Sequence, residues 1–508
     1  MTLYDWLAIL LYLGSTIAIG LWLSRKQDDL EDYFLGGRSI PWWAALLSMV
    51  ATETSAATFL GAPEQGYIRN MTYLQFSVGT IAARFVLASV FIAAFYRLRV
   101  LTIYGFLAER FGPPTQTTTA AVFLLGRLFA SGARLFIGAI AIEVATGLSL
   151  SLSIVLLGMV AVVYTWLGGI KAVIWTDVLQ AIVLVGGGVI ALVSLFGDVP
   201  LTFSETVDFL AANDKFRIFD LGDGSGWDIL TNPYHVVPAV IGGFFLTMAT
   251  HGTDHDMVQR LLTCRESREG QRSLWMSGFV GLLVTTLFLG VGQMLFVYVA
   301  HLPAGEPMGI AAEMLADSGK NGHFFLHYIV SGLPAGVTGL VLAAVFAAAM
   351  SSLDSAMAAM SATFVSDIYR PHFHRNGTQR HYLLAGRLSM VVIGVLLVGV
   401  ALLVVYYYEA NPQTDLLSIA LGVMTFFYGA LLGIFLLGFL TRDRGNTMTN
   451  AAGAIISILL VLLIKQTTSI GWPWFIVMGT LVCFAVAYAG RTAAVVADRY
   501  ADRESETR

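Results

Sequence analysis

The sequence predicts an all-α membrane protein with about thirteen transmembrane helices, and three observations lead to this fold class. Of the 508 residues, 57% are hydrophobic and only 12% are Asp, Glu, Lys or Arg, whereas about 25% charge is usual for soluble domains. Long uncharged runs recur along the whole chain, and about 20 apolar residues suffice for a helix to cross a bilayer. Lipid offers no partner to an unpaired backbone group, which favours helices. These features exclude a soluble enzyme, a secreted disulfide protein, a disordered chain and a nucleic-acid-binding protein.

Glycine, proline and charge clusters divide the chain into thirteen apolar stretches. The first stretch follows an almost uncharged N-terminus and precedes Arg25 and Lys26. This is the reverse of a signal peptide, so we expect the stretch to remain as a helix. Cys264 and Cys483 are too few for a disulfide framework or a thiolate metal site. The expected spans are 4–23, 41–66, 71–97, 116–146, 148–167, 172–196, 233–262, 273–301, 335–367, 385–406, 415–440, 447–465 and 471–490.

The distribution of lysine and arginine predicts the orientation of the chain. If the N-terminus lies outside, twenty-one of these residues fall in cytoplasmic segments, five in external segments and three within spans. Cytoplasmic loops carry the excess of positive charge, so we expect an external N-terminus and a cytoplasmic C-terminus. The compactness of the chain favours a prokaryotic inner membrane. The segments counted as cytoplasmic are 25–38, 97–110, Lys171, 260–272, 370–387, 442–444 and 491–508.

Two of the expected spans contain a polar interruption. The apolar run of the second span stops at 51–55 and that of the seventh span stops at 250–256. Polar residues at membrane depth are tolerated where unwound backbone surrounds a cavity. If the first span is set aside, each interruption falls in the first helix of one of two five-helix halves, the arrangement of an inverted-repeat transporter. The expected divisions are 1–40 with an extra N-terminal helix, 41–199 as the first repeat, 200–232 as an external loop, 233–441 as the second repeat, and 442–508 with two extra helices and a short tail.

Charged residues within the spans are candidates for the functional site, because each costs at least about 2.5–3.5 kcal/mol to insert. For Arg84 a structural ion pair is the favoured interpretation. The same holds for Arg127, with Glu53, Asp254 or a helix C-terminus as its partner. Arg134 fits an ion pair and a solute carboxylate equally well, since a guanidinium binds a carboxylate bidentately.

Span nine carries small residues on one face. At helical spacing Ala348, Ser351, Ser352 and Ser355 lie together, and small residues let another helix approach closely. Hydroxyl and carbonyl oxygens at such a contact suit a sodium ion, which must bind and then leave. Plain helix packing is the alternative interpretation.

His251 and His255 have the spacing of metal ligands on a helix. An intramembrane metal-dependent enzyme is therefore a distant alternative. The chain lacks a catalytic Glu between the two histidines, and Gly252 disfavours a continuous helix there. We favour a polar lining of a solute pathway, and the protein is not expected to be an enzyme.

Four segments resemble the sodium:solute symporter family, which includes transporters for sugars, proline, pantothenate, iodide and sialic acid. They are DYFLGGRSIPWWAALLSMVATETSAATFLG at 32–61, YTWLGGIKAVIWTDVLQ at 164–180, GTDHDMVQRLLT at 252–263 and GLVLAAVFAAAMSSLDSAMAAMSATFVSDIYR at 339–370. The resemblance implies a leucine-transporter-type core made of spans two to eleven. It also implies alternating access, sodium as the coupling ion and no further cofactor.

The resemblance places ion sites on matching positions of this sequence. The main sodium site would use the backbone carbonyls of Ala51, Thr54 and Ala348 and the hydroxyls of Ser351 and Ser352. A possible second ion site would use Asp177, Ser352, Asp354 and Ser355.

The expected partners are sodium, the lipid bilayer and a small organic solute that bears a carboxylate or several hydroxyls. Proton coupling through Glu53, Asp354 or His251 is the alternative to sodium coupling. A solute receptor that no longer transports is disfavoured by the lack of a cytoplasmic output domain. The candidate solute contacts are Glu53, Thr58, Arg134, His251 and Asp254.

Overall fold

The computed structural model describes residues 1–492 except 24–29, 167–168, 304–305, 318–320 and 412–413. Arg25, Lys26 and the part of the expected tail after Thr492 lie outside the described residues. The described residues form helices and short connections.

Ten helices are long and apolar enough to cross a membrane, and a bent helix pair makes an eleventh candidate among the described residues. Two further apolar helices, α9 (Leu150–Thr165) and α23 (Pro473–Tyr488), are shorter. Each expected span therefore coincides with a helix or a helix pair. The long helices are α1 (Leu3–Leu23), α5 (Phe76–Leu87) with its extensions to Leu98, α8 (Pro113–Thr146), α10 (Ile170–Asp198), α13 (Val236–Gly252), α15 (Ser267–Ala300), α18 (Val337–Thr363), α20 (Gln379–Ala410), α21 (Leu416–Leu440) and α22 (Thr447–Thr467).

The first predicted interruption is a bend of 61° between α3 (Trp42–Glu53) and α4 (Ala56–Ile68). Thr54 leaves the helical conformation with φ −82° and ψ 66°, although its N–H still donates to Val50. Ser55 is extended. The polar cluster in the sequence thus marks a real break, as predicted.

The second predicted interruption separates α13 from α14 (His255–Leu262). The Asp254 side chain accepts the N–H of Asp256 at 2.9 Å and so caps α14. The Tyr104 hydroxyl donates to the carbonyl of Thr253 at 3.0 Å. Partners of this kind let the backbone leave the helix at membrane depth. This break is also confirmed.

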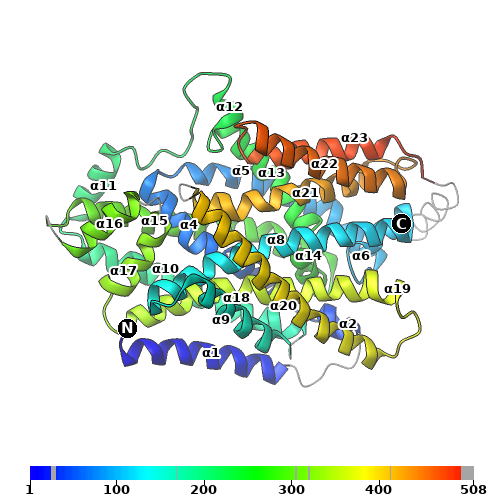
Figure 1. Ribbon diagram of the computed structural model, residues 1–508, viewed down its shortest axis with the longest axis horizontal. Coiled ribbons are helices and arrows are strands. Elements are labelled where there is room, and N and C mark those ends of the chain that lie inside the picture. Colours follow the sequence, from blue (N-terminus) through cyan, green and yellow to red (C-terminus); the bar gives the residue numbers. More distant parts are fainter. Residues whose placement is uncertain (24–29, 167–168, 304–305, 318–320, 412–413, 493–508) are drawn as a thin grey trace.

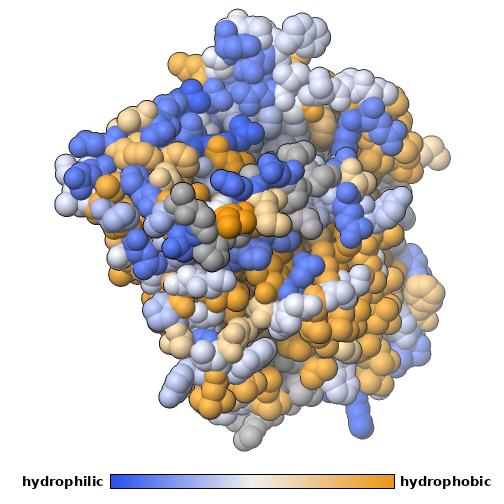
Figure 2. Space-filling model, turned by 60° about the vertical axis from the view of Figure 1, so that its left-hand side comes forward, coloured by the Kyte–Doolittle hydropathy of each residue, from blue (hydrophilic) through white to orange (hydrophobic). Residues whose placement is uncertain are grey.

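The remaining helices surround the two broken ones. Figure 1 shows α1 along the lower edge of the molecule and α22 and α23 along the upper edge. The helix α1 contacts α18 and α10, whereas α23 contacts α21, α22 and α13. Figure 2 shows a broad hydrophobic surface on one flank and a hydrophilic surface toward the upper part of the view. This distribution is expected for a bundle whose sides face lipid.

The segment between α10 and α13 is hydrogen-bonded to the end of α4. It contains the short helix α11 (Phe203–Ala212). Lys215 follows α11 and donates to the carbonyls of Tyr67 at 2.6 Å and Arg69 at 2.7 Å. Its side chain is buried, which lowers the pKa of Lys215 to about 8. Lys215 thereby satisfies carbonyls that the end of α4 leaves without helical partners.

Glycine lets α4 and α15 approach closely. A Cβ on Gly292 would lie 2.0 Å from the carbonyl oxygen of Pro63. A Cβ on Gly66 would lie 2.2 Å from the carbonyl oxygen of Leu289. Small residues at such contacts are characteristic of helix packing in membranes.

Gly292→Ala is expected to destabilise the protein by about 1–3 kcal/mol or more, because the added methyl group would overlap backbone that has no room to move. Thermal unfolding in detergent measures the effect. Gly290→Ala is the matched control, since nothing lies within 4 Å of a Cβ at that position. Equal melting temperatures for the two variants would contradict the close approach.

Candidate functional site

Four of the five residues predicted for the main sodium site meet where the end of α3 contacts α18. The Ser351 hydroxyl donates to the carbonyls of Ala51 at 2.9 Å and Ala348 at 3.3 Å. The Ser352 hydroxyl lies 3.5 Å from the carbonyl oxygen of Ala348. These residues are fully buried. Thr54, the fifth, stands at the break itself. The contact gathers neutral oxygen atoms from two helices.

The residues predicted for a second ion site have separate partners in the structure. Asp177 accepts hydrogen bonds from Ser48 at 2.5 Å and from Arg260 at 3.3 Å. Asp354 accepts the N–H of Ser355 at 2.6 Å within α18. The charge of Asp177 is therefore balanced by a residue that the sequence did not assign to any site.

Arg260 was counted in the cytoplasmic segment 260–272 and also falls at the end of the expected span 233–262, and the structure places it inside the bundle rather than in an exposed loop. Its side chain is completely buried. The guanidinium donates to Ser48 at 2.8 Å, to Thr52 at 2.6 Å and to the Asp256 carboxylate at 2.6 Å. Asp256 and Arg260 are four residues apart, which is the spacing of an ion pair on one helix face. That spacing was the signal in the sequence.

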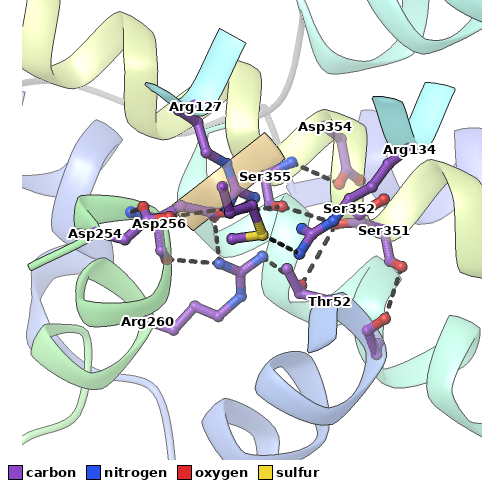
Figure 3. A network of polar contacts seen from close by, with 12 residues as sticks. Thr52, Arg127, Arg134, Asp254, Asp256, Arg260, Ser351, Ser352, Asp354 and Ser355 are labelled. Carbon is purple, nitrogen blue, oxygen red and sulfur yellow. Dashed lines mark hydrogen bonds and ion pairs between the residues drawn. The ribbon is translucent and has the colours of Figure 1, made fainter. Parts of the chain in front are cut away.

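Arg127 occupies an ion pair, in agreement with the favoured interpretation. It donates to Asp254 at 2.9 Å and to Asp256, and Tyr428 donates to Asp254 at 2.6 Å. The two carboxylates are completely buried. Asp254 was expected to contact the solute, but it caps α14 and neutralises Arg127 instead. Figure 3 shows Asp254 and Asp256 grouped beside Arg127 and Arg260, with the serines of α18 on the other side.

A cavity of about 1110 Å³, counting its open mouth, lies beside the first break. Residues of α3, α4, α5, α8, α13, α15 and α21 line it. Four of the predicted solute contacts are on its wall: Glu53, Thr58, Arg134 and His251.

One wall of the cavity carries an ion pair. Arg84 donates to Glu53, and the His251 Nε2 atom lies 3.6 Å from the Glu53 carboxylate. Arg84 is nearly buried, whereas the Glu53 side chain is 30% exposed. The structural ion pair favoured for Arg84 is confirmed. It leaves this wall polar but without net charge.

Arg134 lies on another wall without an ion-pair partner among the described residues. Its Nη2 atom lies 3.6 Å from the sulfur of Met424, and its Nε and Nη1 atoms have no hydrogen-bond partner there. Arg127, seven residues earlier on α8, has two carboxylates. Among the described residues that line the cavity, Arg134 is therefore a cation without a carboxylate partner.

His251 and His255 lie on different helices, because α13 ends between them. The break removes the shared helix face that would direct both rings at one metal ion. His251 lines the cavity, whereas His255 is completely buried.

Arg127→Gln is expected to destabilise the protein by about 3–5 kcal/mol, because the buried Asp254 loses its cation and Asp256 keeps only Arg260. Arg134→Gln is the matched change on the same helix. It is expected to alter stability by at most about 1 kcal/mol, since no carboxylate loses a partner. Thermal melting in detergent measures both variants. Equal losses would show that Arg134 is also a structural cation.

Known proteins match nearly the whole chain. The sequence profile of the family described as "Sodium:solute symporter family" matches residues 33–460. The sodium/sialic acid symporter NanT of Aliivibrio fischeri is 30% identical over 487 residues, which cover 95% of this chain and 92% of that protein. The sodium/glucose cotransporter of Vibrio parahaemolyticus is 28% identical over 479 residues, which cover 90% and 83%.

Two solved transporter structures are similar to this chain in fold. The substrate-bound, outward-open state of a Na⁺-coupled sialic acid symporter superposes with a TM-score of 0.84 at 26% identity, over 96% of this chain and 97% of that chain. A nucleobase-cation-symport-1 family transporter in a closed conformation shares the fold, with a TM-score of 0.53 at 16% identity over 93% and 98%. The chain belongs to the sodium:solute symporter family, and its activity is sodium-coupled symport of a small organic solute.

Proposed function

We propose that the solute is a small carboxylate with several hydroxyl groups and that Arg134 binds the carboxylate. The observation that carries this proposal is the contrast between two arginines on α8. Arg127 forms ion pairs with Asp254 and Asp256, whereas Arg134 lines the cavity and has no ion-pair partner in the described part of the chain. A planar guanidinium is well suited to bind a carboxylate through two hydrogen bonds.

The other walls fit a hydroxylated solute. Glu53, Thr58 and His251 offer acceptors and donors to hydroxyl groups. One oxygen of Glu53 has no hydrogen-bond partner in the described part of the chain. Because two relatives are named sialic acid symporters, a sialic acid is the first solute to test.

The main sodium site is proposed at the carbonyls of Ala51, Thr54 and Ala348 and the hydroxyls of Ser351 and Ser352. The contacts between Ser351 and the carbonyls of Ala51 and Ala348 support this assignment. An ion here would hold the end of α3 against α18. Neutral oxygen ligands suit a cation that must also be released.

A second ion site is proposed around Asp177, Ser352, Asp354 and Ser355. Arg260 already supplies positive charge to Asp177. We therefore place the centre of this site on the α18 side, near Asp354 and Ser355.

The proposed architecture is thirteen transmembrane helices with a five-plus-five inverted repeat, with the boundaries 1–40, 41–199, 200–232, 233–441 and 442–508. Reciprocal packing supports the repeat. The first broken helix contacts α15, the second helix of the other half, while α13 contacts α5. In the same way α8 contacts α21 and α18 contacts α10. The proposed orientation has the N-terminus outside and the C-terminus in the cytoplasm of a prokaryotic cell.

In the proposed cycle, sodium binds first and favours an outward-open state with an ordered solute site. Solute binding then allows closure and release on the inside. A membrane potential of 100 mV contributes about 2.3 kcal/mol for each charge moved. This energy corresponds to roughly a 50-fold accumulation of a neutral solute by one sodium ion.

Sodium is expected to stabilise the purified protein by about 2.7 kcal/mol at 100 times its dissociation constant. NaCl and choline chloride are compared at equal ionic strength by thermal melting. The double variant Ser351→Ala, Ser352→Ala is expected to lose this response, since it lacks both hydroxyl ligands. Ser361→Ala is the matched control, because this buried serine of α18 bonds to Gly386 instead. A response that survives in the double variant would place the sodium site elsewhere.

Arg134→Lys is expected to raise the KM for a carboxylate solute at least about tenfold, because lysine keeps the charge but loses the bidentate geometry. Uptake of labelled sialic acid and of other sugar acids into proteoliposomes measures this effect. Competition by the corresponding neutral sugars is the specificity control. Stronger competition by neutral sugars than by acids would contradict carboxylate recognition. Full uptake in choline buffer at fixed pH would instead indicate proton coupling.

A further inference from the structure

The carboxylate of Asp256 on α14 contacts residues of α8 and α18. These two helices carry Arg134 and the proposed sodium ligands Ser351 and Ser352. Its Oδ2 atom accepts from Arg127, which lies on the cavity wall. Its Oδ1 atom accepts from Arg260 at 2.6 Å. The Ser355 hydroxyl of α18 lies 3.5 Å from Oδ2. A carboxylate has about four acceptor positions: the two arginines use two of them, and the Ser355 hydroxyl, whose one hydrogen is donated to Ser351, lies beside Oδ2.

Two short paths lead from Asp256 to the proposed sodium site. In the first, Ser355 donates to the carbonyl of Ser351 at 2.8 Å. In the second, Arg260 donates to Thr52 at 2.6 Å, and the Thr52 hydroxyl lies 3.4 Å from the same carbonyl. Ser351 is the residue of α18 whose hydroxyl contacts the carbonyl of Ala51 on α3, just before the first break. Figure 3 shows this chain of contacts as dashed lines between α14, α3 and α18.

The Asp256 carboxylate also holds Arg127 in place, and Arg127 lies on the same helix as Arg134, α8. Arg127 lies on α8 two turns before Arg134 and is completely buried. Buried charges interact strongly because little water screens them. A movement of Arg127 therefore changes the electrostatic energy of Asp256 and, through it, that of Arg260.

We propose that Asp256 is a positioning residue that couples the sodium site to the solute cavity, an inference that rests on the two sites under the proposed function. A sodium ion at Ala51 and Ser351 competes for the oxygen atoms that now join α3 to α18. The resulting shift of Ser351 passes to Asp256 through Ser355 and through Thr52 with Arg260. Asp256 then changes the position of Arg127 and, with it, the shape of the cavity wall.

The test uses sodium alone as the probe. Ser77 on α5 lines the cavity. Both native cysteines are buried. The rate at which a maleimide labels the variant Ser77→Cys therefore measures how accessible the cavity is. In this background sodium is expected to raise the labelling rate about fivefold or more over choline, within the usual range for coupled sites. Thermal melting of the same samples shows separately whether sodium binds.

Asp256→Asn keeps the size of the side chain and removes its charge. We expect this variant still to be stabilised by sodium while the ratio of labelling rates falls to about 1. Asp367→Asn is the matched control, because Asp367 is also a buried carboxylate but bonds to Thr102 and Gln116 outside this chain of contacts. The control is expected to keep both responses.

Thr52→Val interrupts only one of the two paths and leaves the ion pairs of Arg260 with Asp177 and Asp256 intact. It is expected to lower the ratio of labelling rates while sodium still stabilises the protein, and it decides the matter if Asp256→Asn does not fold. A wild-type ratio in the Asp256 variant would overturn the inference. Loss of sodium stabilisation in that variant would also overturn it, because Asp256 would then hold the ion site itself. If the parent protein is not stabilised by sodium, the proposed sodium site fails before the coupling is tested.

Discussion

The structure depends on the pairing of buried guanidinium and carboxylate groups around Asp256. Arg127 and Arg260 are completely buried and share this one carboxylate. Removing an ion from water costs several kcal/mol even after the protein relaxes, so a buried charge needs close partners of opposite sign. Asp254 and Asp177 complete the balance. The helices α3, α8, α10 and α14 are held at the positions where these charges meet.

The second break in the bundle follows from the same requirement. A continuous helix through Thr253 and Asp254 would distribute the polar residues of 251–256 around its surface, and some would face apolar neighbours. Ending α13 at Gly252 lets Asp254 cap α14 and lets both Asp254 and Asp256 face Arg127. The first break has a different chemical result. The end of α3 places the carbonyl of Ala51 against Ser351, so it offers acceptors, which suit a cation.

The features that depend on local sequence could be predicted, whereas most contacts between distant residues could not; the pairing of Arg127 with Asp254 is an exception. The two breaks follow from polar clusters inside apolar runs, and the small face of α18 follows from helical spacing. Arg127 and Arg134 lie two turns apart on one stripe of α8, and the sequence favoured an ion pair for Arg127 without fixing which carboxylates would separate their roles. The difference comes from Asp254 and Asp256, more than a hundred residues away. The burial of Arg260 was missed because a count of charges gives no sign of its distant partners Thr52 and Asp177.

The lack of an ion-pair partner for Arg134 among the described residues predicts positive coupling, in which the ion and the solute each strengthen the binding of the other. A guanidinium that has no ion-pair partner among the described residues is costly to bury, and under the proposed function an anionic solute would offset that cost. Glu53 and Arg84 neutralise each other, so they neither repel nor strongly attract the solute. At the proposed site, a sodium ion would add a second positive charge near the solute, where little water screens it. Each cation lowers the energy of the anion, and by linkage the anion lowers the energy of the sodium ion equally. Electrostatics alone therefore favours binding of both together over binding of either one, which is the condition that symport requires.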